Sequence, residues 1–207
     1  MIDRLIFDFD GTISDSYPQF VKFFHLFAEE NGLTLSITDE ELFRALNVNV
    51  RRAFETTGWN QNCTYRTFLD DFHNKQIKYA LDFKAFDEAV ELLQYAAQTG
   101  RHNYIYTHSG PIVSEMLKNM GILHLFDFIL DASYSFPVKP KPDALRFLSE
   151  KFSLDPKNCM MIGDRPIDAL AGMNAGMTGC LWDAYGFFPD AEVDHKVKKL
   201  SEIKNLI

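Results

Sequence analysis

The sequence predicts an α/β fold: a parallel sheet with helices on both faces and a helical region inserted after the first strand. Five short segments have the composition of β-strands: residues 5–9, 103–106, 128–130, 159–162 and 179–182. Segments with helical periodicity lie between them, and strands that alternate with helices are typical of parallel sheets with right-handed crossovers. The stretch from about 17 to 81 contains no convincing strand, so we expect it to form the inserted helical region.

Apolar side chains at helical spacing indicate where the helices lie. Four stripes accompany the predicted strands: Phe86, Ala89, Val90, Leu93 and Ala97; Ile112, Val113, Met116, Leu117 and Met120; Ala144, Leu145 and Leu148; Ile167, Leu170, Ala171 and Ala175. The inserted region is rich in phenylalanine at the same spacing, which we interpret as core packing. These patterns predict a Rossmann-like domain of residues 1–14 and 82–207 and a helical cap domain of residues 15–81.

The composition of the chain excludes several classes of partner. The 207 residues carry a formal net charge of -8, whereas nucleic acids and anionic membranes demand a basic surface. A small phosphorylated ligand remains compatible, because a metal ion and one or two cationic side chains can reverse the sign locally. The three cysteines are widely spaced and indicate neither a disulfide framework nor a zinc site. No leader or membrane-spanning run is evident, so we expect a cytoplasmic protein, with a monomer favoured.

Two acidic residues follow the first predicted strand, in the segment Asp8-Phe9-Asp10-Gly11-Thr12. If the chain is still extended there, residues two apart lie on the same side, so Asp8 and Asp10 would face the same space. One carboxylate could then attack a substrate while its neighbour donates and accepts protons. Ligands of open α/β sheets bind beyond such strand ends. The alternative interpretation is an Asp-Gly turn in which Asp10 accepts hydrogen bonds from local amides.

With these two acidic residues directly after its first predicted strand, the chain resembles the haloacid dehalogenase superfamily, in particular its phosphatase branch. The first motif of that family, D-x-D-G-[TV], matches residues 8–12, and Thr107 stands directly after the second core strand, where the family has Thr or Ser. The family segments K-P-x-P and G-D-x-x-x-D match residues 139–142 and 163–168. The resemblance covers about 1–14 and 82–185; the inserted helices match the type 1 cap of the family in position and size only.

The resemblance implies a role for each acidic motif residue. Asp8 would be the nucleophile that becomes phosphorylated, and Asp10 would be the general acid and base. Mg²⁺ would be bound by Asp8, by the main-chain carbonyl of Asp10 and by Asp164, because hard oxygen ligands suit this ion. Asp168 would support the metal site without binding the ion. Asp164 and Asp168 could instead cap the helix that begins near Pro166.

The resemblance also implies the residues that bind phosphate. These would be Thr107, the neighbouring main-chain N–H at His108, and Lys139, whose charge offsets that of the phosphoryl oxygens. Many family members have Asn where this chain has His108. Taken alone, Thr107 could cap the helix that follows Pro111, and a Lys-Pro loop is usually solvated surface.

The motifs together predict a Mg²⁺-dependent phosphatase that acts on a small phosphorylated metabolite, similar to phosphoglycolate phosphatases. A sugar-phosphate mutase of the β-phosphoglucomutase type is an alternative, because mutases share all four motifs. A non-catalytic binding module is a further alternative, which the retained acidic and lysine residues disfavour. In the predicted cap, residues 47–52 lie between two helical patterns where relatives place a substrate-facing loop. Arg51 is therefore a candidate for contact with a second phosphate or a carboxylate of the substrate.

Overall fold

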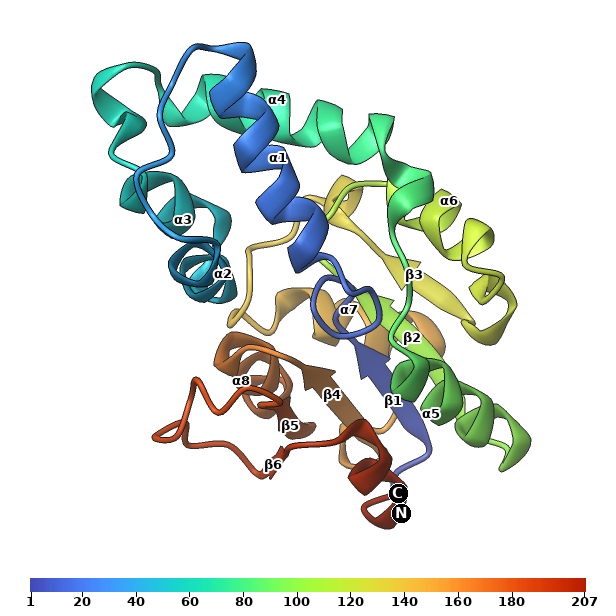
Figure 1. Ribbon diagram of the computed structural model, residues 1–207. Helices are drawn as coiled ribbons and strands as arrows, with labels where there is room; N and C mark the ends of the chain where they lie inside the picture. Colours follow the sequence, from blue (N-terminus) through green and yellow to red (C-terminus); the bar gives the residue numbers. More distant parts are fainter. The chain divides into compact units, whose positions relative to one another are not determined.

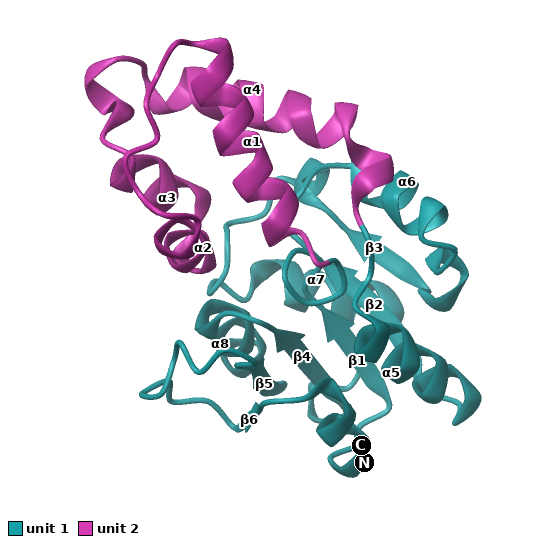
Figure 2. Cartoon of the chain, in the orientation of Figure 1, with its two compact units in different colours: residues 1–14, 84–207 teal, residues 15–83 magenta.

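The computed structural model describes all 207 residues (Figure 1). It divides the chain into two compact units, shown in different colours in Figure 2. Unit 1 comprises residues 1–14 and 84–207, and unit 2 comprises residues 15–83. The chain passes from one unit to the other only twice, after residues 14 and 83. None of the helices combines the length and the apolar character that crossing a membrane would require.

A six-stranded sheet forms the centre of unit 1 (Figure 1). Its strands are β1 (Arg4–Phe7), β2 (His102–Tyr106), β3 (Phe128–Leu130), β4 (Cys159–Gly163), β5 (Thr178–Trp182) and β6 (His195–Val197). All neighbouring strands pair in parallel, in the order β3-β2-β1-β4-β5-β6. The predicted parallel α/β sheet is therefore confirmed. The edge strand β6 is not among the predicted strands, because Val197 is the only apolar residue of its three.

The strand order reverses beside β1. From β1 the chain continues to β2 and β3 on one side, and it then crosses to β4 and β5 on the other side. Phe7, the last residue of β1, pairs with Ile105 of β2 and with Ile162 of β4. Open α/β sheets bind ligands at such a reversal, beyond the carboxyl ends of the strands. The loops after β1, β2 and β4 therefore meet at the edge where a ligand is expected.

Four α-helices accompany the sheet: α5 (Asp87–Gln98), α6 (Ile112–Asn119), α7 (Asp143–Phe152) and α8 (Pro166–Asn174). Short 3₁₀ helices occur at Leu123–Leu125, Ala132–Tyr134, Pro156–Asn158 and Leu200–Asn205. On one face, α7 and α8 pack against alternate strand residues in a single core cluster that includes Ile6, Tyr104, Tyr106, Cys159, Met161, Leu145, Leu148 and Ala171. The cluster takes every second residue of each strand, because successive side chains of a strand point to opposite faces of the sheet.

Helix α8 packs against β4 and β5 through its smallest side chains. Its fully buried residues are Asp168, Ala169, Ala171 and Gly172, whereas the predicted stripe residues Ile167, Leu170 and Ala175 are only half-buried. The glycines of the strands explain this difference. A Cβ at Gly163 would lie 2.3 Å from the Cβ of Asp168, and one at Gly179 would lie 2.4 Å from the carbonyl oxygen of Ala169. The helix therefore lies too close to the sheet for large side chains, and Asp168 is pressed against the end of β4.

Unit 2 is entirely helical, as the absence of strand patterns predicts (Figure 2). It contains α1 (Tyr17–Glu30), α2 (Asp39–Val48), α3 (Val50–Thr56) and α4 (Tyr65–Lys78), with 3₁₀ helices at Trp59–Gln61 and Ala80–Asp82. Aromatic rings fill its interior: Phe20, Phe23, Phe24, Phe27, Phe54, Trp59, Phe68 and Phe72 are all buried. The ring centroids of Phe24 and Phe68, for example, are 4.6 Å apart. The phenylalanines at helical spacing therefore form the core of unit 2, as predicted.

Candidate active site

Asp8 lies directly beyond β1, at the centre of the sheet. Its main-chain N–H donates to the carbonyl oxygen of Ile162 at 2.8 Å, so this residue is still anchored to β4. The chain then turns, because the carbonyl oxygen of Phe9 accepts from Ile13 and Ser14 at 3.0 and 2.9 Å. The strand ends at Phe7 and not at the predicted Phe9, so Asp8 and Asp10 do not share one extended strand.

A buried lysine binds two buried carboxylates at this edge of the sheet. The Nζ atom of Lys139 donates to Oδ1 of Asp8 and to Oδ1 of Asp168, at 2.8 Å in each case. It also lies 4.6 Å from the centroid of the Tyr106 ring. The alternative that this Lys-Pro loop is solvated surface is therefore wrong for Lys139, whose side chain is inaccessible to solvent. Lys141 of the same loop is exposed.

The charges in this group shift its pKa values. Burial by itself would raise the pKa of Asp8, but the charges of Lys139 and Arg165 outweigh it, and the pKa of Asp8 lies below its ordinary value. Burial would lower the pKa of Lys139, and the carboxylates of Asp168 and Asp8 raise it above its ordinary value. Burial raises the pKa of Asp168, and Lys139 offsets this only in part. Asp8 is therefore an ionised carboxylate next to a fixed cation.

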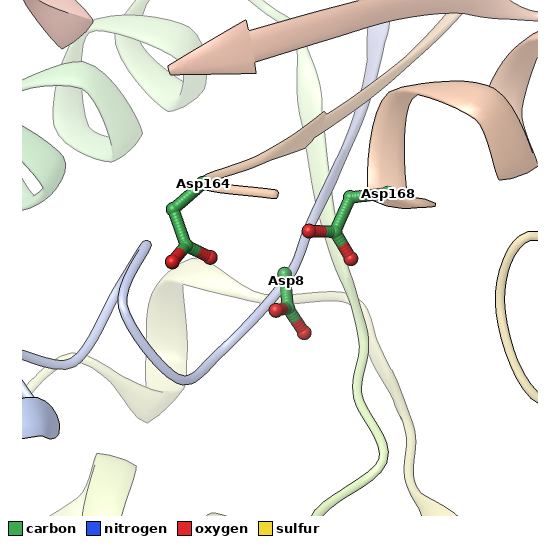
Figure 3. A group of neighbouring side chains, drawn as sticks. All are labelled: Asp8, Asp164 and Asp168. Atoms are coloured by element: carbon green, nitrogen blue, oxygen red, sulfur yellow. The ribbon is translucent and has the colours of Figure 1, made fainter. Parts of the chain in front are cut away.

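Three buried carboxylates face a common space (Figure 3). One oxygen each from Asp8, Asp164 and Asp168 lies within 4.8 Å of the others. The Oδ1 atom of Asp164 accepts from the hydroxyl of Thr12 at 3.2 Å. Asp168 also caps its own helix, because its Oδ2 accepts from the N–H of Arg165 at 3.1 Å. Such an all-oxygen set of donors fits a hard divalent cation.

The loop after β2 approaches Asp10. The hydroxyl of Ser109 donates to Oδ2 of Asp10 at 2.5 Å. The Oγ1 atom of Thr107 accepts from the N–H of Ser109 at 3.0 Å, which leaves the proton of the Thr107 hydroxyl to donate elsewhere. Thr107 does not cap α6, whose N-cap position is Pro111 without a side-chain hydrogen bond. Ser109 is absent from the predicted site, because a serine in a loop has no distinguishing pattern.

His108 connects the loop after β2 to the lysine loop, which comprises residues 139–142. Its Nε2 accepts from the main-chain N–H of Lys139 at 3.0 Å, so this nitrogen carries no proton. His108 is an exposed residue, yet partial loss of hydration of its ring and then the charge of Lys139 lower its pKa to about 4. A neutral imidazole is therefore part of the folded site, and it positions the residue that holds Asp8.

Arg165 is a second cation beside Asp8. Its Nη2 lies 3.4 Å from Oδ2 of Asp8, and its Nε lies 3.9 Å from Oδ2 of Asp168. Arg165 has no predicted role, because it occupies a variable position of the G-D-x-x-x-D motif and arginines beside a motif are usually solvated. Its partner Asp8 is distant in sequence, so no local pattern indicates the contact.

Arg51 belongs to unit 2 and lies in a helix. Residues 47–52 do not form the predicted loop: α2 ends at Val48, and α3 begins directly after Asn49, whose side chain accepts from the N–H of Arg52 at 2.7 Å. The guanidinium carbon of Arg51 lies 4.2 Å from the centroid of the Tyr65 ring, within the same unit. A role of Arg51 in substrate binding stays a prediction.

Known proteins are similar to this chain in sequence and in fold. The profile of a family described as haloacid dehalogenase-like hydrolase matches residues 5–181. A putative pyrophosphatase PpaX from Clostridium perfringens is 26% identical over 186 residues, which cover 87% of this chain and 83% of the relative. A phosphoglycolate phosphatase from Aliivibrio fischeri is 28% identical over 189 residues, covering 84% and 81% of the two chains. The crystal structure of a predicted phosphoglycolate phosphatase from Haemophilus somnus has a TM-score of 0.84 at 20% identity, with 99% and 97% covered.

Proposed function

The chain belongs to the haloacid dehalogenase-like hydrolase family, and we propose that it is a phosphatase that hydrolyses a small phosphomonoester with Asp8 as the nucleophile. The observation that carries the proposal is the 2.8 Å contact between Asp8 and Lys139 at the end of the central strand. A buried, ionised carboxylate can attack phosphorus there while the adjacent cation offsets the charge of the phosphoryl oxygens.

The residues around Asp8 can divide the reaction into two steps. In the first, a carboxylate oxygen of Asp8 bonds to phosphorus, the bond from phosphorus to the leaving oxygen breaks, and Asp10 donates a proton to that oxygen. In the second, Asp10 takes a proton from a water that attacks the aspartyl phosphate, which releases orthophosphate and restores the Asp8 carboxylate. The Ser109 hydroxyl, which bonds Asp10 at 2.5 Å, would orient the acid. Lys139 and the Thr107 hydroxyl would bind phosphoryl oxygens.

The acidic residues suit Mg²⁺ as the cofactor. Asp8, Asp164 and the main-chain carbonyl of Asp10 would hold the ion, while Asp168 is already engaged by Lys139 and by the N–H of Arg165. When bound, Mg²⁺ neutralises phosphoryl charge and orients the phosphoryl group. Asp168 would then act on the site indirectly, through its hold on Lys139.

We infer that the substrate is a small phosphorylated metabolite. The acidic balance of the chain disfavours nucleic acid. The names of the relatives make phosphoglycolate and inorganic pyrophosphate the first compounds to test. Unit 2, which joins unit 1 at only two points in the chain, would act as the cap that selects the part of the substrate beyond the phosphate.

A panel of phosphorylated metabolites with Mg²⁺, scored by released phosphate, tests the activity and its substrate together. Asp8→Asn should abolish turnover, and Asp10→Asn should reduce kcat by about 10²–10⁴-fold, the usual contribution of general acid–base catalysis. In acid-quenched wild-type protein, mass spectrometry should find a phosphoryl group on the peptide that contains Asp8. Asp131→Asn is the matched control, because Asp131 follows β3 and its side chain accepts hydrogen bonds from Ser133, outside the group around Asp8. A folded Asp8→Asn protein with wild-type kcat would refute the mechanism.

Metal dependence is tested in the same assay. EDTA should abolish phosphate release and Mg²⁺ should restore it, whereas excess Ca²⁺ should inhibit, since Ca²⁺ prefers more ligands at longer distances. Full activity after metal removal would contradict the proposed Mg²⁺ site. Formation of an isomeric phosphate ester in place of orthophosphate would identify a mutase.

A further inference from the structure

Both carboxylate oxygens of Asp8 are in contact with a cation. Lys139 holds Oδ1 at 2.8 Å, and the guanidinium of Arg165 lies 3.4 Å from Oδ2. Lys139 binds a phosphoryl oxygen in the proposed reaction, whereas Arg165 has no role in it. A metal ion that binds Asp8 must therefore take an oxygen that one of these two cations already contacts.

The two cations differ in burial and in their distance from the carboxylates. Lys139 has no solvent-exposed side-chain surface and is fixed by a second buried carboxylate, that of Asp168, at 2.8 Å. The Arg165 side chain is 16% exposed, and it lies farther from the carboxylates, 3.4 Å from Asp8 and 3.9 Å from Asp168. Its main chain is anchored separately, because its N–H donates to Asp168 at 3.1 Å. Arg165 is thus the cation whose side chain can leave Asp8 while its backbone stays in place.

We propose that Arg165 is a metal-gated anion-binding residue: it pairs with Oδ2 of Asp8 when no metal is bound, and it binds an oxygen of the substrate phosphate once a divalent cation occupies that carboxylate. This inference rests on the proposed function, which supplies the metal and the phosphate. A guanidinium suits the role, because it keeps its charge at any relevant pH and offers several donors that match an oxyanion.

The proposal makes metal and phosphate binding cooperative. Displacement of Arg165 opposes the binding of the metal, and the displaced guanidinium then favours the phosphate. Coupling between two ligands is reciprocal, so phosphate should in turn strengthen the binding of Mg²⁺. Removing the guanidinium should therefore change the two affinities in opposite directions.

Isothermal titration calorimetry on the whole chain tests this without measuring turnover. Mg²⁺ is titrated into metal-free protein, and orthophosphate is then titrated at saturating Mg²⁺. Compared with wild type, Arg165→Gln should bind Mg²⁺ about fivefold more tightly or better, by the usual size of such couplings. It should bind orthophosphate about tenfold more weakly or worse, as expected for the loss of a charged hydrogen bond.

Two further variants separate a direct contact from a general effect of charge. Lys141→Gln removes one positive charge from an exposed position of the lysine loop. Its affinities for Mg²⁺ and for orthophosphate should stay near those of wild type. Arg165→Lys keeps the positive charge but lacks the planar guanidinium with its several donors. Its affinity for orthophosphate should therefore fall between those of wild type and Arg165→Gln.

Three results would overturn the inference: unchanged Mg²⁺ affinity in both Arg165 variants, unchanged orthophosphate affinity, or an equal effect of Lys141→Gln. In each of these cases a wild type that binds Mg²⁺ and releases phosphate leaves the proposed function standing. A wild type that binds no Mg²⁺ would instead refute the proposed Mg²⁺ site, and the inference with it.

Discussion

Each unit of the protein contains one buried lysine that is paired with two carboxylates. In unit 1, Lys139 bonds Asp8 and Asp168 at 2.8 Å, and the side chains of both acids are 2% exposed or less. In unit 2, Lys75 bonds Glu30 and Asp71 at 2.5 and 2.6 Å, but these side chains are 49% and 32% exposed. The pKa of each lysine is raised above its ordinary value, against the opposing effect of burial.

The difference lies in what surrounds the partners. The carboxylates of Lys75 remain hydrated, so this group connects the end of α1 to α4 at little electrostatic cost. The carboxylates of Lys139 have lost water at the end of a parallel sheet, where charges interact strongly and burial without a partner is costly. A buried lysine with two carboxylates is therefore a contact between helices in one unit and a candidate catalytic centre in the other.

Replacing each lysine by methionine should give the largest contrast. Lys139→Met removes the only cation that lies within 3 Å of both Asp8 and Asp168 and leaves the two buried carboxylates with the more distant Arg165, so we expect a loss of about 3–5 kcal/mol in the free energy of unfolding. We also expect a fall in kcat of about 10²–10³-fold, as for removal of one oxyanion donor. Lys75→Met should change the free energy of unfolding by at most about 1 kcal/mol and leave kcat unchanged. Urea denaturation and steady-state kinetics measure both, and equal losses in the two variants would contradict the comparison.

Arg51→Ala tests whether unit 2 contributes to substrate selection. If Arg51 binds the substrate, KM for the best substrate of the panel should rise about tenfold, the typical loss of a charged hydrogen bond. The effect on p-nitrophenyl phosphate should be much smaller, because this compound offers few contacts beyond the phosphate. Arg52→Ala is the matched control, an exposed arginine in the same helical turn. Equal changes for both substrates, or none, would show that specificity arises elsewhere.

The smallest effect concerns the neutral imidazole of His108. Its pKa falls from 6.5 to about 4 on folding, so between these values the unfolded chain binds the proton and the folded protein does not. Stability should therefore decrease as the pH falls through this window. His108→Asn keeps an oxygen that can accept from the N–H of Lys139 but cannot titrate, so its stability should vary less from pH 6.5 to about 4. Urea midpoints over a pH series measure this; parallel profiles for the two proteins would contradict it.

Sequence patterns predict much of the sheet and the location of the candidate site. Asp8 and Asp164 directly follow predicted strands, and Lys139 precedes a predicted helix. Because the carboxyl ends of parallel strands meet at one edge of the sheet, the sequence places these residues near that edge. Ser109 and Arg165 are different, because they contact partners 99 and 157 residues away. Their residue types are common in loops, so only the fold distinguishes them from solvated side chains.

The sequence by itself determined the alternation of strands and helices, the all-helical composition of unit 2 and the acidic and lysine motifs, because periodic burial and motif spacing are local properties of a chain. Only the tertiary structure decided that β1 ends at Phe7, that α8 buries its small residues, and that Asp168 reaches Lys139. The reason is steric: Gly163 leaves no room for a Cβ beside Asp168, and this close approach between helix and sheet has no periodic signature in the sequence.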